Sequence, residues 1–279
     1  MTNIVLIGHV CIDHNVVRGE LTKSWGSPLM YIGKYFNHRH AEANVTLIAP
    51  HGRDFNDYNS NLKVLTSTNP DDPTMLYKNV VDEDGNRTQY CLNSEHSEPT
   101  PLTDEMKSVL AEADIVFVAP LSPQYSVDYV RQAFSETPLN SLKVLLPQGY
   151  LRYIAEDGLV SPRPFNEAKD LLPLFNLVVL SDEDTTDAVN KAVAWQQQSS
   201  ATTFIVTENK RGAVIIGDGG QSEIPTEAIP QKNIINPIGC GDVFTAATAY
   251  GLSDKLTIEQ AVIAGHGAAR ESLLSDKLL

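Results

Sequence analysis

Residues 236–244 read Asn-Pro-Ile-Gly-Cys-Gly-Asp-Val-Phe and lead into an apolar, alanine-rich run. Glycines flank Cys240, so the backbone from Gly239 to Gly241 can bend tightly and expose its N–H groups. The run predicts a buried helix over 241–251, and a helix start offers unpaired donors and the partial positive charge that a phosphate favours. Asp242 then stands where a carboxylate can take a proton from a hydroxyl attacking phosphorus. A glycine-rich linker, with Asp242 only stabilising the helix start, explains the same residues.

The stretch resembles the C-terminal signature of the PfkB (ribokinase-like) carbohydrate kinase family, Asp-Thr-x-Gly-Ala-Gly-Asp-x-Phe. Both glycines, the final acid and the last Phe match, whereas the first Asp, the Thr and the Ala are replaced, which marks a divergent member. The resemblance implies that Asp242 is the catalytic base. It also implies an anion hole made by the backbone amides of Gly239, Cys240 and Gly241.

Composition narrows the class of protein. The chain has 279 residues, 42% of them hydrophobic, and a net charge of −14, which argues against nucleic-acid binding. No apolar run approaches the roughly 20 residues that cross a bilayer, and the start lacks the basic region and cleavage site of an export signal. Three scattered cysteines form neither a disulfide framework nor a zinc site, so a reducing cytoplasm is the expected location.

Alternating strands and helices predict an α/β fold with a mostly parallel central sheet covered on both faces. The resemblance implies a ribokinase-like three-layer sandwich. The expected strands are 3–7, 45–48, 115–118, 142–146, 177–180, 203–206 and 213–216. The expected helices are 103–113, 126–134, 165–172, 182–198, 241–251 and 257–274, the last opening with a capping box of Thr257 and Gln260.

Residues 62–92 break this rhythm with three β-rich stretches and a hairpin turn at 83–86. They predict either a small lid sheet or an extra antiparallel edge on the main sheet. The resemblance favours the lid, formed by 62–92 and parts of 12–30 within a single kinase domain over 1–279. An exposed edge of such a sheet can pair with a second copy of the chain, so a homodimer through the lid is a further expectation.

Four residues are candidates for contact with the substrate. Asp13 follows the first strand, where open α/β sheets bind ligands, and the resemblance makes it the substrate acid. Gly26 lies where the family shows Gly-Gly-x-x-x-Asn. Gln148 and Arg152 follow another strand and offer donors for a hydroxyl-rich or phosphorylated ligand. A solvated turn aspartate and a loop arginine paired with a surface acid are the simpler explanations.

The resemblance places the nucleotide at a second group of residues. Ser181 and Asp184 align with the family's Asn-x-x-Glu motif, which organises Mg²⁺ and phosphates, so Asp184 is expected to reach Mg²⁺ through water. Acids that merely favour a helix start are the alternative. The nucleotide loop and an adjacent helix position are represented by Thr207, Asn209, Gly212 and His266.

The sequence therefore predicts an ATP-dependent, Mg²⁺-requiring phosphotransferase that acts on a hydroxyl of a sugar, an inositol-like polyol or a nucleoside, with Asp242 as general base. The alternative is a catalytically degenerate homologue that binds a nucleotide or sugar. A dinucleotide-dependent oxidoreductase is disfavoured because the first strand lacks Gly-x-Gly-x-x-Gly. The motifs do not identify the acceptor, because pocket shape determines selectivity.

Overall fold

The computed structural model describes residues 1–17, 19–57, 61–82 and 87–275. Within these residues no helix combines the length and the apolar character needed to span a membrane.

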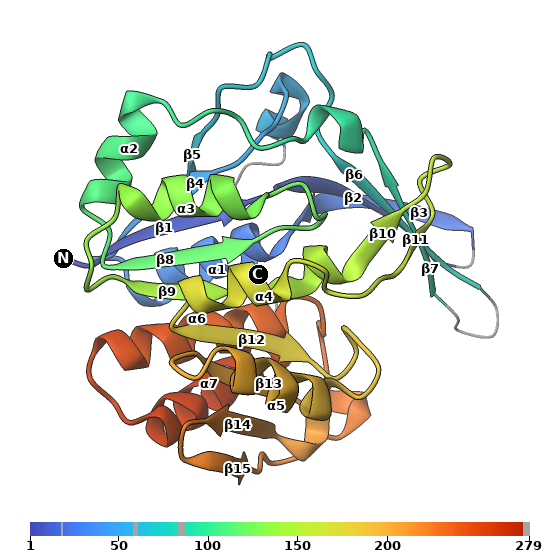
Figure 1. The fold of residues 1–279 in the computed structure, drawn as a ribbon. Helices are drawn as coiled ribbons and strands as arrows, with labels where there is room; N and C mark the ends of the chain where they lie inside the picture. The colour runs from blue at the N-terminus through green and yellow to red at the C-terminus, as the bar shows by residue number, and fades with distance from the viewer. Residues whose placement is uncertain (18, 58–60, 83–86, 276–279) are drawn as a thin grey trace.

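A nine-stranded sheet forms the centre of the molecule (Figure 1), in the order β15-β14-β13-β12-β9-β8-β1-β4-β5. All neighbouring strands from β13 to β5 run parallel, and β14 and β15 add an antiparallel edge. The strands are β1 (Asn3–Gly8), β4 (Asn44–Ile48), β5 (Lys63–Leu65), β8 (Ile115–Ala119), β9 (Leu142–Leu145), β12 (Leu177–Ser181), β13 (Thr203–Thr207), β14 (Ala213–Gly217) and β15 (Gly220–Ile224).

The central strands are continuously apolar because both of their faces are covered. In β1, Ile4 and Leu6 belong to one hydrophobic cluster, and Val5 and Ile7 belong to another on the opposite face. Because successive side chains of a strand point to opposite faces, this one apolar strand contributes to both hydrophobic cores.

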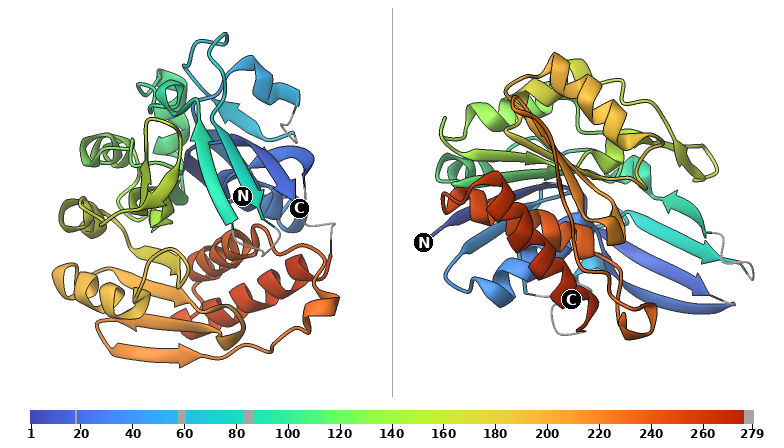
Figure 2. Two further views of the ribbon diagram at one scale, coloured as in Figure 1. Left: turned by 90° about the vertical axis from the view of Figure 1, so that its right-hand side faces the viewer. Right: turned by 90° about the horizontal axis from the view of Figure 1, so that it is seen from below.

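Helices cover both faces, which confirms the predicted three-layer α/β fold (Figure 2). One layer holds α1 (Pro28–Arg39), α6 (Cys240–Ser253) and α7 (Ile258–Leu273). The other holds α2 (Asp104–Ala111), α3 (Val127–Ser135), α4 (Ala168–Leu171) and α5 (Ala188–Gln198). Short 3₁₀ turns occupy Arg53–Asp57, Ser94–His96, Pro147–Leu151, Leu172–Leu174, Asn209–Arg211 and Gln231–Asn233.

The helices differ in part from the sequence expectation. The expected helix over 182–198 begins only at Ala188, because the Asp184 carboxylate accepts a hydrogen bond from the Ser181 N–H and closes a turn, and Asp187 has a left-handed φ of 57°. Helix α1 was not expected at all. The capping box of Thr257 and Gln260 is present at the start of α7.

A four-stranded sheet projects from the end of β1, in the order β3-β2-β6-β7 (Figure 1). Its strands are β2 (Cys11–Val17), β3 (Glu20–Gly26), β6 (Leu76–Val81) and β7 (Arg87–Leu92). Of the three stretches expected in the lid, the first is instead β5, which pairs with β4 at the edge of the large sheet. The expected turn at 83–86 lies outside the described residues. Beside β7 lies a two-stranded ribbon of β10 (Arg152–Ile154) and β11 (Val160–Pro162).

Candidate active site

A cavity of about 1150 Å³ lies between the carboxyl edge of the large sheet, the small sheet and the start of α6. Parallel strands end at one edge, so loops far apart in sequence meet there. The cavity is lined by the candidate residues Asp13, Gln148, Arg152, Ser181, Asp184, Thr207, Asn209, Gly212, Gly239, Cys240, Gly241, Asp242 and His266. Gly26 is the one candidate outside the lining, and its neighbour Ser27 is part of it.

The start of α6 is shaped by Gly239, which has a left-handed φ of 76° and precedes the first helical residue. A Cβ atom on Gly239 would overlap the ring of Tyr31, whereas a Cβ atom on Gly241 would meet open space. The first N–H groups of a helix have no partner within the helix. This turn therefore presents backbone donors and a positive helix end to the cavity.

Asp242 lies in the first turn of α6 and is half-buried at the cavity wall. Burial and, to a smaller extent, the negative charge of Asp184 raise the pKa of its carboxyl to about 7, although the positive charge of Arg152 opposes both effects. A carboxylate with a pKa near neutrality is well matched to accepting a proton from an alcohol.

Asp13 on β2 lies beside the end of β3, where Gly26 makes space for it. A Cβ atom at position 26 would overlap the Asp13 carboxylate, so the glycine acts through Asp13 rather than by lining the cavity. Burial raises the pKa of Asp13 to about 6, although hydrogen bonding from Cys11 and the charges of Arg87 and Arg152 lower it.

Gln148 and Asp184, predicted for different ligands, contact each other. The Gln148 Nε2 donates to Asp184 Oδ1 at 3.2 Å, and the Ser181 N–H donates to Asp184 Oδ2 at 2.8 Å. Both carboxylate oxygens of Asp184 thus already accept a hydrogen bond. Within the described residues, no group of three His, Cys, Asp or Glu side chains converges as a metal-ligand set. Asp184 therefore fits a Mg²⁺ ion held through water and phosphate oxygens better than one held directly.

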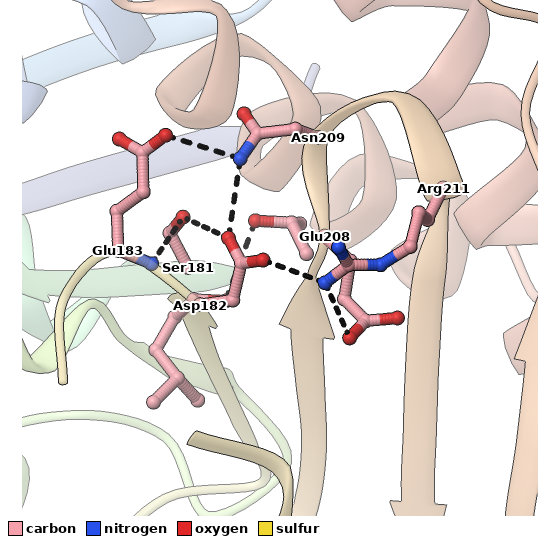
Figure 3. A network of polar contacts seen from close by, with 8 residues as sticks. Ser181, Asp182, Glu183, Glu208, Asn209 and Arg211 are labelled. Carbon is pink, nitrogen blue, oxygen red and sulfur yellow. Dashed lines mark hydrogen bonds and ion pairs between the residues drawn. The ribbon is translucent and has the colours of Figure 1, made fainter. Parts of the chain in front are cut away.

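Polar contacts connect the loops after β12 and β13 (Figure 3). Asn209 Nδ2 donates to Asp182 Oδ1 and to Glu183 Oε1, both at 3.1 Å. Arg211 pairs with Asp182 at 2.9 Å and with Glu208 at 3.0 Å. Asn209 also adopts a φ of 52°, which asparagine tolerates better than most residues. Two side chains of the expected nucleotide loop, Asn209 and Arg211, therefore bind acids of the loop after β12, and Arg211 also binds Glu208 of its own loop.

His266 reaches the same cavity from α7. Its Nε2 lies 3.3 Å from the Ile224 carbonyl oxygen, and its ring packs on Phe244 with centroids 5.1 Å apart. Burial lowers its pKa, so the ring is neutral at physiological pH. A neutral imidazole packed against Phe244 can contact a flat ligand.

Sequence reasoning missed part of the lining. Asn15, Asn79, Arg87 and Gln89 face the cavity from the small sheet. A signal was available for Arg87 and Gln89, because alternate residues of a strand share a face, and Asn79 lies directly across from Gln89.

Comparison with known proteins agrees with this architecture. A pyrophosphate-dependent kinase of the ribokinase family, solved with a pyrophosphate analogue and myo-inositol, matches with a TM-score of 0.76 at 19% identity, over 97% of this chain and 94% of that chain. A ribokinase from Arabidopsis thaliana, solved with ribose and ATP, matches with a TM-score of 0.68 at 14% identity, over 99% and 94%. At these identities the likeness shows the fold.

Sequence comparison is more specific. The chain is 31% identical over 97 residues to a cytidine kinase of Thermococcus kodakarensis, a stretch that covers 35% of this chain and only 33% of that kinase. The family model described as pfkB family carbohydrate kinase matches residues 43–277, which is most of the chain. The protein belongs to the pfkB family of carbohydrate kinases.

Proposed function

We propose that this chain transfers the γ-phosphoryl group of ATP to a hydroxyl of a small sugar, polyol or nucleoside, with Asp242 as the general base. The observation that carries the proposal is the position of Asp242. Its half-buried carboxylate lies in the first turn of a glycine-started helix, in one cavity with Asp13. One turn of helix thereby supplies both an anion-binding site and a proton acceptor.

The chain's own residues divide the reaction between them. Asp13 accepts hydrogen bonds from acceptor hydroxyls, and Asp242 takes the proton of the hydroxyl that attacks the γ-phosphorus. The new O–P bond forms as the bond to the β-phosphate oxygen breaks, and ADP leaves. The amides of Gly239, Cys240 and Gly241 stabilise the charge on the transferred group. Mg²⁺, held through water at Asp184, would neutralise charge on the donor phosphates.

The donor end of the cavity supports a nucleotide. The neutral ring of His266 lines it, together with apolar side chains from the loop after β15 and from α7. These side chains are Ile229, Ile234, Ile238, Ala269 and Leu273. A purine or pyrimidine base can pack there, while the triphosphate extends to the start of α6. Pyrophosphate has no base to fill this region, so ATP is the donor that the lining favours.

The small sheet is proposed as a lid over the acceptor, within one kinase domain. Closing it would exclude water, which otherwise accepts the phosphoryl group. Its edge strands β3 and β7 carry the exposed side chains of Leu21 and Leu92, which support a homodimer through the lid. Light scattering of the native chain and of Leu21→Lys tests the dimer.

The function is tested with an acceptor panel of sugars, inositols and nucleosides, each incubated with Mg²⁺ and either ATP or pyrophosphate. We expect transfer with ATP, and none in a parallel preparation of Asp242→Asn. The alternative is a degenerate homologue that only binds, which the occupied side chains of Asn209 and Arg211 support. Thermal stabilisation by ATP or acceptor without any transfer would favour that alternative.

A further inference from the structure

Two arginines in the cavity differ from the other arginines of the described chain. Six of these side chains pair with a carboxylate within 4.0 Å: Arg39, Arg53, Arg131, Arg163, Arg211 and Arg270. Within the described residues, Arg87 and Arg152 have no such partner, and both line the cavity. In a chain with a net charge of −14, two arginines of one cavity that have no carboxylate partner among the described residues need an explanation.

Arg87 is held in place by neutral side chains of the small sheet. Its Nη2 donates to Asn79 Oδ1 at 2.8 Å, and Gln89 Nε2 donates to the same oxygen at 2.9 Å. Asn79 is only 7% exposed, and its Nδ2 donates a hydrogen bond to Asn15 Oδ1 at 2.9 Å. The network orients the guanidinium through neutral partners, while the negative charges of Asp13 and Glu183 act on it without a contact within 4.0 Å.

Arg152 is held close by. Its guanidinium carbon lies 5.3 Å from the centroid of the Tyr77 ring, on β6. Tyr77 and Asn79 are two residues apart on that strand, so they share a face and lie about 7 Å apart. The two guanidinium groups, one over Tyr77 and one bonded to Asn79, are therefore neighbours. The positive charge of Arg152 also contributes, after desolvation, to lowering the pKa of Arg87.

We infer that the acceptor carries an anionic group, a phosphate monoester or a carboxylate, which Arg87 and Arg152 bind together at the lid end of the cavity. Planar guanidinium groups match the oxygens of both anions through paired hydrogen bonds. This assignment rests on the proposed function and narrows its substrate class. The anionic group anchors one end of the acceptor, and Asp13 and Asp242 receive the hydroxyl end.

The donor phosphates are a poorer occupant for this pair. They belong at the start of α6, where the backbone supplies the donors, whereas Arg87 comes from β7, an edge strand of the small sheet. The arginines nearer the donor end, Arg211 and Arg270, already pair with Asp182 and Glu227.

The test uses matched acceptors with and without the anion: ribose and ribose 5-phosphate, glucose with glucose 6-phosphate and gluconate, myo-inositol and its monophosphate, cytidine and cytidine 5′-monophosphate. Rates with ATP and calorimetric binding without donor are measured for the native chain, Arg87→Gln and Arg87→Lys. Arg131→Gln is the matched control, because Arg131 is an exposed arginine of α3 outside the cavity.

We expect an anionic member to have a higher kcat/KM than its neutral partner. Arg87→Gln should raise the KM for the anionic acceptor about 10- to 100-fold, since a lost hydrogen bond to a charged group weakens binding by about that factor. The KM for ATP should stay within about twofold of the native value. For the anionic acceptor, the KM of Arg87→Lys should lie between those of the native chain and Arg87→Gln, and the KM of Arg131→Gln should equal the native value. The kcat/KM values of the phosphorylated and carboxylated acceptors show which anion the site prefers.

Equal kcat/KM for neutral and anionic partners, or an equal rise in KM for both in Arg87→Gln, overturns the inference. Absence of transfer with every acceptor counts against the proposed function instead. In that case calorimetry decides: binding of an anionic member that Arg87→Gln weakens supports the site, and failure of every anionic member to bind the native chain removes it.

Discussion

The ring of Tyr31 packs on Gly239 so closely that no side chain fits at position 239. Tyr31 belongs to α1 and Gly239 precedes α6, so this contact sets how the two helix starts face the cavity. It also separates two glycines that look equivalent in sequence. Gly239 is required by packing and by its φ of 76°, whereas a Cβ atom on Gly241 meets open space.

Alanine at each of these glycines should therefore give opposite results. Gly239→Ala should lower the free energy of unfolding by about 2 kcal/mol or more, from the left-handed φ and the overlap with Tyr31. Gly241→Ala should leave that free energy unchanged or slightly higher, because Ala favours helix, yet should reduce kcat/KM with ATP at least about tenfold by blocking the donor phosphate. Urea denaturation and initial rates measure both.

Gly219→Ala is the matched control, since its Cβ atom also meets open space but lies outside the cavity lining. Full activity of Gly241→Ala would contradict the anion hole at this turn.

Replacing the proposed base should remove catalysis without harming the fold. Asp242→Asn should lower kcat by about 10²- to 10⁴-fold, the usual contribution of a general base. The folded-state pKa of about 7 exceeds the ordinary carboxyl value of 3.8, so the ionised group destabilises the folded chain increasingly as pH rises from about 4 to 7. Asp242→Asn should therefore melt higher than the native chain at pH 8, with a smaller difference at pH 4. Turnover close to that of the native chain would eliminate Asp242 as the base.

The pH dependence of kcat/KM should reveal the neighbouring acid. Asp242 acts as a base only when ionised, so activity should rise with pH around a midpoint near 7. The negative charge of Asp184 contributes to that raised pKa, and Asp184→Asn should move the midpoint to lower pH. Asp182→Asn is the control, because Asp182 binds Asn209 and Arg211 instead. An unchanged midpoint in Asp184→Asn would contradict the coupling between the two acids.

The large sheet and the glycine turn were predictable because their signals are local. Apolar strands such as 115–118 must be covered on both faces, and the residues around Asp242 combine backbone freedom with a helix pattern. Helix α1 carries a local signal as well, since Pro28 stands at a first helical position, but the resemblance assigns parts of 12–30 to the lid sheet instead.

Other features depend on partners that the sequence does not name. The sequence of β5 is β-rich like that of the lid strands, and only its pairing with β4 places it in the large sheet. The helix predicted over 182–198 begins later than expected, because the Asp184 carboxylate closes a turn rather than capping a helix. Whether an arginine has a carboxylate partner, as Arg211 does and Arg87 does not among the described residues, is equally a tertiary property.

Ser27 precedes α1 with a φ of 107° and is only 6% exposed. Its hydroxyl has no hydrogen-bond partner among the described residues, and the residue lines the cavity. A buried, unpaired hydroxyl on a strained backbone costs stability, and such strain is found where function uses it. We therefore expect the hydroxyl to bind the acceptor.

Ser27→Gly and Ser27→Ala separate strain from binding. Both remove the hydroxyl, so both should raise the acceptor KM several-fold while the KM for ATP stays the same. Only glycine adopts the positive φ freely, so Ser27→Gly should be more stable than Ser27→Ala by about 1 kcal/mol in urea denaturation. Equal stability of the two variants would contradict the strain, and an unchanged acceptor KM in both would show that the hydroxyl does not contact the substrate.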